Sequence, residues 1–142
     1  MPIRLRLLIA ALVLLGVGGF VLAGVVGDDS SGDISISGNA AIDAIIPTRG
    51  AEVLQQQSVG IDLAAPYRLT KLIIAPTDDP AAGIDVSEQV QERTGLNQFL
   101  FTPDDGKLIE ALSPDLNCVF ASYIEVARPA DTLTVDWCFE VS

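Results

Sequence analysis

The chain has 142 residues, a net charge of −11 and no histidine, so it lacks the commonest general base and the usual catalytic triads. All acidic residues follow position 27, which leaves residues 28–142 with six Lys or Arg, 19 Asp or Glu and a net charge of −13. Such a domain is repelled by nucleic acid and by anionic lipid headgroups, so we expect no nucleic-acid partner.

An uncharged apolar stretch of 20 residues runs from Leu7 to Val26, which is the length that a helix needs to cross a bilayer. Arg4 and Arg6 precede it and the acids follow it. The positive-inside rule therefore predicts a cytoplasmic N-terminus (residues 1–6), a single transmembrane helix (7–26) and an extracytoplasmic remainder anchored in the cell membrane. A cleaved signal peptide is the main alternative, although the stretch is long for one and lacks a clear cleavage site. A helix buried in a soluble domain is the third.

Small residues recur within this stretch, and Gly19 and Ala23 are spaced so that another transmembrane helix could approach closely. Glycine is common in membrane spans for other reasons, and we favour that plainer interpretation. The spacing nevertheless supports a second hypothesis for function, a small accessory subunit that docks on a membrane complex through this helix.

Residues 27–41 are rich in Gly, Ser and Asp and are predicted to form a flexible linker. From position 42 to 142, short apolar runs are separated by Pro, Gly, Asn and Asp, which is typical of an antiparallel β-sandwich. The sequence thus predicts a mainly β extracytoplasmic domain of about seven or eight strands. The expected strands are Ile42–Ile46, Val59–Leu63, Leu69–Ile74, Ile84–Val86, Phe99–Phe101, Lys107–Leu112, Cys118–Val126 and Thr132–Val141.

One helical turn is expected over Ser87–Arg93, where Asp85 and Glu88 have the spacing of a capping pair and Gly95 follows. Tight turns are expected at Thr48–Gly50 and at Pro103–Gly106.

The two cysteines, Cys118 and Cys138, lie in the last predicted hairpin, and an even number of cysteines outside the cytoplasm predicts one disulfide. The apolar positions conflict with this pairing. Phe120 opposite Trp137 would place the apolar residues of both strands on one face, but in that register the cysteines point to opposite faces. A disulfide therefore requires either a β-bulge or a different relation between the two strands. The alternative is two buried thiols that act as small hydrophobic residues.

Residues Ile45–Val53 and Val59–Leu63, with a Pro-x-x-Gly-Ala turn, resemble the opening of bacterial immunoglobulin-like domains. The runs Asn97–Pro103 and Val135–Phe139 are similar to those of uncharacterised single-pass envelope proteins of actinobacteria. The resemblance implies an immunoglobulin-like fold and an envelope location, and it transfers no functional residue. Unlike antibody domains, this chain has its tryptophan beside one cysteine, so a disulfide would join neighbouring strands of one sheet.

Nothing in the sequence forms a catalytic motif or a metal or cofactor site, and we expect no catalysis and no cofactor. The paired acids Asp78–Asp79 and Asp104–Asp105 fall in turns, and a Ser–Lys pair using Lys71 or Lys107 has no supporting motif. The leading hypothesis is a module for protein interaction or envelope structure that uses strand edges, loops or exposed aromatics. The candidate aromatics are Tyr67, Tyr123 and Trp137, of which Trp137 is expected in the core. A calcium-dependent surface module using the acidic loops is the third hypothesis.

Overall fold

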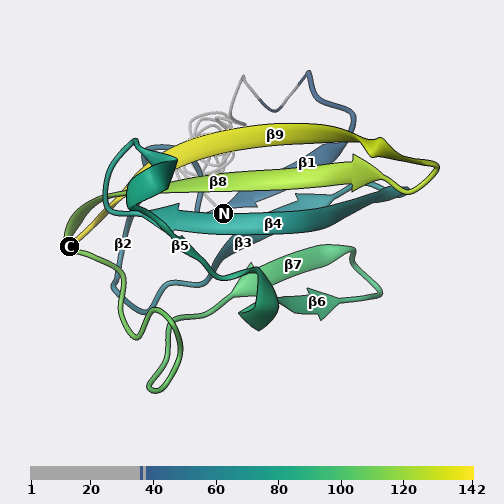
Figure 1. Ribbon diagram of the computed structural model, residues 1–142. Helices are drawn as coiled ribbons and strands as arrows, with labels where there is room; N and C mark the ends of the chain where they lie inside the picture. Colours follow the sequence, from purple (N-terminus) through teal and green to yellow (C-terminus); the bar gives the residue numbers. More distant parts are fainter. Residues whose placement is uncertain (1–35, 37) are drawn as a thin grey trace, which may run out of the picture. The chain divides into compact units, whose positions relative to one another are not determined.

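The computed structural model describes residue 36 and residues 38–142 (Figure 1). Within these residues it contains nine strands and two short 3₁₀ helices. They are β1 (Ile42–Ile46), β2 (Glu52–Val53), β3 (Val59–Leu63), β4 (Tyr67–Ala75), η1 (Pro80–Ala82), β5 (Ile84–Asp85), η2 (Ser87–Gln89), β6 (Gln91–Arg93), β7 (Gln98–Phe101), β8 (Asp115–Glu125) and β9 (Arg128–Val141). The predicted span Leu7–Val26, with Gly19 and Ala23, lies outside the described residues, among which no helix is long and apolar enough to cross a membrane.

The strands form two sheets, which confirms the mainly β architecture. One sheet has the order β1-β3-β7-β6 and the other has the order β2-β9-β8-β4-β5. In chain order these correspond to the A-B-E-D and G-F-C sheets of an immunoglobulin sandwich, with β5 in the place of the added C′ strand. All pairings are antiparallel except that of the two-residue strand β2 with the end of β9, which is parallel.

The core lies between the two sheets and is filled by alternate residues of the paired strands. The largest side chains that are almost completely buried include Trp137, Phe101, Phe139, Ile61, Leu63 and Leu72. Trp137 is therefore a core residue, as predicted. Tyr123 is also buried, and Tyr67 packs against it edge-to-face with 6.0 Å between ring centroids, so neither tyrosine is the freely exposed binding aromatic that we considered.

The folded domain begins before Ile42, although the linker was predicted to continue to residue 41. Ile36 and Ala41 belong to the hydrophobic core, and Asn39 Nδ2 donates a hydrogen bond to Tyr123 Oη at 3.1 Å. The last residues of the predicted linker 27–41 are therefore held on the sandwich. Residues 27–35 and 37 lie outside the described residues.

The last hairpin does not adopt the register that its apolar positions suggested, with Phe120 opposite Trp137. Cys118 lies directly opposite Cys138, Val119 opposite Trp137 and Phe120 opposite Asp136, with no bulge until the end of the hairpin at Ile124 and Glu125. Val119 and Trp137 point into the core, so the cysteines and Phe120 lie on the outer face of the sheet.

The apolar pattern of β8 did not indicate the correct register because part of the outer face of the sheet is also covered. Helix η1 lies against β4 and β8, and Cys118 is fully buried although it points away from the core (Figure 1). Apolar residues therefore occur on both faces of β8, and the alternation that normally distinguishes the two faces is lost there.

The disulfide between Cys118 and Cys138 is formed, as predicted, and it joins neighbouring strands of one sheet. Cys138 O accepts a hydrogen bond from Gly50 N on the other side of β9. The two cysteines therefore occupy a position of the β8–β9 ladder without backbone hydrogen bonds between them, where side chains approach most closely. A structural disulfide is typical of a domain outside the cytoplasm.

Two further predictions of local structure were wrong. Only Ser87–Gln89 of the expected helical turn is helical, and Gln91–Arg93 forms β6, which pairs with β7. Lys107–Leu112 was expected to be a strand but forms a loop. This loop is held by side chains, because Leu108 N donates to Gln89 Oε1 at 3.0 Å and Lys107 Nζ donates to Thr102 O at 2.6 Å.

Asp62, a half-buried residue of β3, should make the stability of the domain depend on pH. Burial, and secondarily the charge of Asp43, raise the pKa of Asp62, whose carboxylate accepts a hydrogen bond from the Gln98 side chain. Gln98 Oε1 is itself buried without a partner. Asp62→Asn removes the charge and supplies an amide donor for that oxygen, so we expect the free energy of unfolding at pH 7 to rise by about 1 kcal/mol or less.

The direction in which this stability gain depends on pH follows from the raised pKa of Asp62. The charged form destabilises the fold above the folded-state pKa, and this cost disappears as the pH falls below the ordinary value of 3.8. Urea titrations at pH 7 and near pH 3 should therefore show a larger gain for Asp62→Asn at pH 7. An equal gain at both values would show that the charge is not the cause.

Candidate functional site

A groove with a volume of about 550 Å³ lies between β5 and the loop 102–114, and most of the residues that line it are apolar. This volume is within the range of ligand-binding sites. We call it the β5 groove. Its lining residues are Ile74, Ala75, Pro76, Ala82, Ile84, Lys107, Leu108, Ile109, Glu110, Ala111, Leu112, Ser113 and Asn117.

One wall of the β5 groove is the segment from η1 to η2, which is fixed on the edge of β4. Asp79 Oδ1 caps η1 by accepting a hydrogen bond from Ala81 N at 2.9 Å. Val86 N donates to Leu72 O at 2.9 Å, and Leu72 N donates to Ser87 Oγ at 2.9 Å. The fully buried side chain of Val86 completes this attachment.

The close packing of this wall depends on Gly83. A Cβ atom at that position would lie 2.4 Å from Ile73 Cγ2 and 3.1 Å from Ala75 Cβ. The segment can therefore lie flat on β4 only because residue 83 has no side chain.

The opposite wall is the loop 102–114, whose two ends are anchored. Lys107 Nζ binds Thr102 O and lies 5.5 Å from the centre of the Phe101 ring. Gly106 has a positive φ of 79° in the turn that sequence analysis predicted at Pro103–Gly106. At the other end, Leu112 is buried and its N–H donates to Gln55 O at 2.9 Å.

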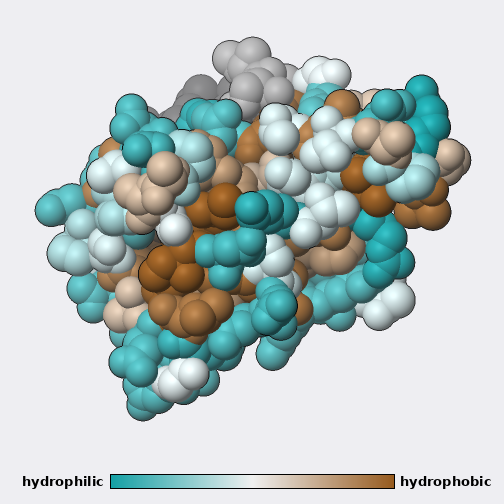
Figure 2. All heavy atoms as spheres, in the orientation of Figure 1, coloured by the Kyte–Doolittle hydropathy of each residue, from teal (hydrophilic) through white to brown (hydrophobic). Residues whose placement is uncertain are grey.

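Two large aliphatic side chains are left exposed at the β5 groove, Ile84 with 43 % and Leu108 with 55 % of its surface accessible. Beneath them the buried residues Ile74 and Leu112 form an apolar floor. Figure 2 shows hydrophobic residues gathered on this face between η1 and the loop, with hydrophilic residues around them. Contiguous apolar surface inside a polar rim is typical of an interaction site.

A second hollow of about 410 Å³ continues past Leu108 along the edge of β4. It is lined by Thr70, Lys71, Asp85, Ser87, Glu88 and Leu108. Leu108 lines both hollows, so the two form one continuous surface with Leu108 between them. Glu110 lines the first hollow and Glu88 lines the second.

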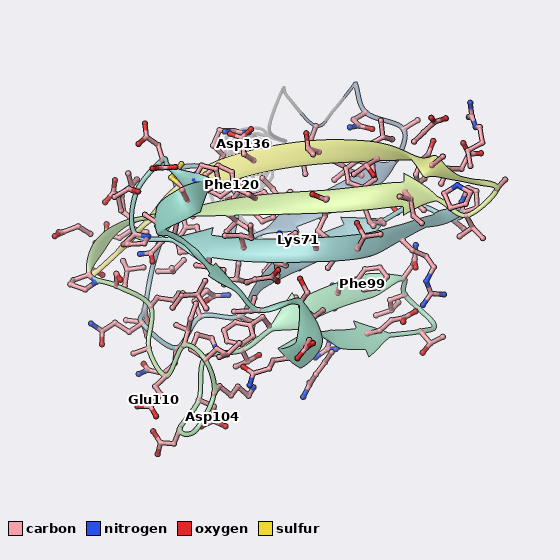
Figure 3. The ribbon with its side chains drawn as sticks, in the orientation of Figure 1. Lys71, Phe99, Asp104, Glu110, Phe120 and Asp136 are labelled. Atoms are coloured by element: carbon pink, nitrogen blue, oxygen red, sulfur yellow. A yellow bond between two sulfur atoms is a disulfide. The ribbon has the colours of Figure 1, made fainter. Side chains whose placement is uncertain are left out.

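The two segments that form this surface are strongly acidic. Residues 76–89 and 102–117 together contain eight Asp or Glu and one lysine. The nearby lysines are already engaged, because Lys107 binds the loop backbone and Lys71 Nζ lies 3.6 Å from Asp85 Oδ2. In Figure 3, Asp104 and Glu110 lie together on the loop, whereas Lys71 lies on β4. The potential over the β5 groove is therefore negative.

Ser87 lines the same hollow as Lys71, but it is not arranged as a nucleophile. Ser87 Oγ accepts the hydrogen bond from Leu72 N and donates to Asp85 Oδ1, so the hydroxyl group supports the chain at η2. This bond from Ser87, together with Lys71, lowers the pKa of Asp85. A carboxylate with a lowered pKa is a weak base, so the arrangement favours structure over Ser–Lys chemistry.

The predicted acidic turns have structural roles as expected. Asp79 caps η1, and Asp104 Oδ1 accepts a hydrogen bond from Asp105 N at 2.9 Å. Among residues 36 and 38–142, no group of three or more His, Cys, Asp or Glu is placed to hold a metal ion. The calcium hypothesis therefore gains no support from this part of the chain.

Sequence analysis did not identify the β5 groove. It noted the acidic pairs and Lys71 and Lys107 as separate features, and it placed Lys107–Leu112 in a strand. The available signal was that Ile84 lies between Gly83 and Asp85, and that Leu108 lies two positions from Gly106 and from Glu110. Such surroundings are unusual for a large aliphatic residue in a strand core.

No protein-family model and no curated protein matches the sequence. A similar solved structure is that of selenomethionine PcoC, a copper resistance protein from Escherichia coli. The similarity has a TM-score of 0.49 and 13 % sequence identity, and it covers 71 % of this chain and 98 % of that chain. The predicted relationship to actinobacterial envelope proteins stays a prediction.

Proposed function

We propose that this chain is a membrane-tethered, extracytoplasmic immunoglobulin-like module that binds another envelope protein and performs no catalysis. The observation that carries the proposal is the β5 groove, where Ile84 and Leu108 are exposed over an apolar floor inside an acidic rim. Exposed apolar side chains do not stabilise a monomer. When a partner covers them, the removal of their apolar surface from water favours binding.

Two features support the location and the tether. The Cys118–Cys138 disulfide favours an oxidising compartment, and the apolar stretch Leu7–Val26 follows Arg4 and Arg6 in the order that the positive-inside rule requires. The absence of histidine from the sequence and the lowered pKa of Asp85 support a role without acid–base catalysis.

Site-specific photocrosslinking in cells tests the proposal. A benzophenone amino acid in place of Leu108 should give a discrete adduct with an envelope protein. The same probe in place of Leu96, which is 63 % exposed at the β6–β7 turn, is the matched control and should not give it. We expect Ile84→Asp to abolish the adduct from position 108. No adduct, or the same adducts from both positions, would contradict binding at the β5 groove.

A further inference from the structure

The charges around the β5 groove restrict the kind of partner that it can accept. Glu110 lines the groove, Glu88 lines the adjoining hollow, and Leu108 lies between them as a residue common to both. The surface therefore presents an acidic, an apolar and a second acidic region in succession. Its complement is a segment with a large aliphatic side chain between two basic residues.

The lysines of the site offset only part of this negative charge. Lys107 Nζ is held at 2.6 Å by Thr102 O, and Lys71 is beside Asp85. The Glu88 and Glu110 side chains make no ion pair within the described residues, while Glu110 Oε1 accepts a hydrogen bond from Gly106 N at 3.2 Å. Two carboxylates are thus left to attract cationic groups of a partner.

Other occupants fit the same surface less well. A second copy of the chain would bring two domains of charge −13 together, and anionic lipid headgroups would meet the same repulsion. A neutral apolar ligand would leave the acidic rim without a role. A basic and apolar protein segment uses both features.

We infer that the β5 groove binds a segment of an exported protein in which one or two large aliphatic residues are flanked on both sides by Lys or Arg. This inference rests on the proposed function and adds the chemistry of the partner. The aliphatic side chain lies against Ile84 and Leu108, and the two cationic groups face Glu110 and Glu88.

Peptide binding to the full-length chain in nanodiscs of zwitterionic lipid tests the inference. The probe is a fluorescein-labelled peptide, Gly-Ser-Lys-Leu-Ile-Lys-Ser-Gly, whose anisotropy is measured at 50 mM and 300 mM NaCl. We expect saturable binding that weakens at the higher salt concentration. Replacing both lysines with glutamate, or the Leu-Ile pair with serine, should each weaken binding about tenfold or more.

Variants of the chain assign the binding to the β5 groove. Leu108→Asp should weaken it about tenfold or more, whereas Leu96→Asp, the exposed control at the β6–β7 turn, should leave it unchanged. Glu88→Gln with Glu110→Gln should weaken it about three- to tenfold and remove most of the salt dependence. Glutamine at position 110 can still accept the bond from Gly106, so the loop is kept.

The inference is overturned if the Glu-substituted peptide binds as well as the Lys peptide, or if Leu108→Asp has no effect. It is also overturned if the chain sediments as a dimer that Leu108→Asp dissociates, because a second copy then fills the groove. These failures differ from failure of the proposed function. An envelope adduct from position 108 together with absent peptide binding would retain the groove and reject only this partner chemistry.

Discussion

Replacing Gly60 with alanine is expected to prevent stable folding of the sandwich. A Cβ atom on residue 60 would lie 1.9 Å from Phe99 O and 2.9 Å from Phe99 C, which are backbone atoms of the neighbouring strand β7. Residue 60 is in β3, which is paired with β1 on one side and β7 on the other, so neither strand can move away without disrupting the sheet. We expect a loss of about 3 kcal/mol or more in the free energy of unfolding.

Chemical denaturation monitored by Trp137 fluorescence measures this loss. Gly95→Ala is the matched control, because a Cβ atom there meets nothing within 4 Å, and it should change stability by about 0.5 kcal/mol or less. A Gly60→Ala variant with wild-type stability would show that β3 and β7 are not as close as described.

The second large effect is expected on removal of the disulfide. Cys118 and Cys138 are 20 positions apart, and in the chain-entropy model a cross-link over a loop of this size contributes about 3 kcal/mol. The variant with both Cys118→Ala and Cys138→Ala should lose about this amount. Because Cys118 is fully buried beneath η1, the smaller alanine side chain adds a modest packing cost.

Urea denaturation with and without reductant separates the two contributions. The wild-type chain should be destabilised by reductant, whereas the double alanine variant should give the same curve under both conditions. The disulfide contributes little to stability if the wild-type midpoint does not move once free thiols have been detected in the reduced protein.

The β-sandwich was predictable because short apolar runs are separated by turn residues along residues 42–142. Val59–Leu63 alternates in character and is bounded by turn residues, and the structure places its strand at those residues. Ile42–Ile46 was likewise exact. The disulfide followed from the number of cysteines and the expected compartment.

The register of the last hairpin was not predictable from alternation, because η1 covers part of the outer face of β8. On that face, Cys118 is fully buried and Phe120, labelled in Figure 3, is half-buried, so their apolar character resembles that of core residues. The segment that covers this face packs closely on β4 because residue 83 is glycine. The alternation of residues within one strand does not reveal such a contact with another segment.

The β5 groove could not be predicted from the sequence for a similar reason. Ile84 and Leu108 are 24 positions apart, and they are brought to one surface by the bond from Leu108 N to Gln89 Oε1 and by the packing of Leu112. The apolar residues of 107–112 have a strand-like composition, but side-chain hydrogen bonds hold them as a loop. Local propensity was overridden by tertiary contacts.

The proposed function requires first of all that this domain folds outside the cytoplasm. The most direct measurement is the redox state of Cys118 and Cys138 in growing cells, obtained by acid quenching and alkylation of the full-length chain with a mass-tagged maleimide. We predict that both cysteines are protected from alkylation until reductant is added, and that a control chain lacking residues 1–27 is alkylated at once. Free cysteines in the full-length chain would contradict the account.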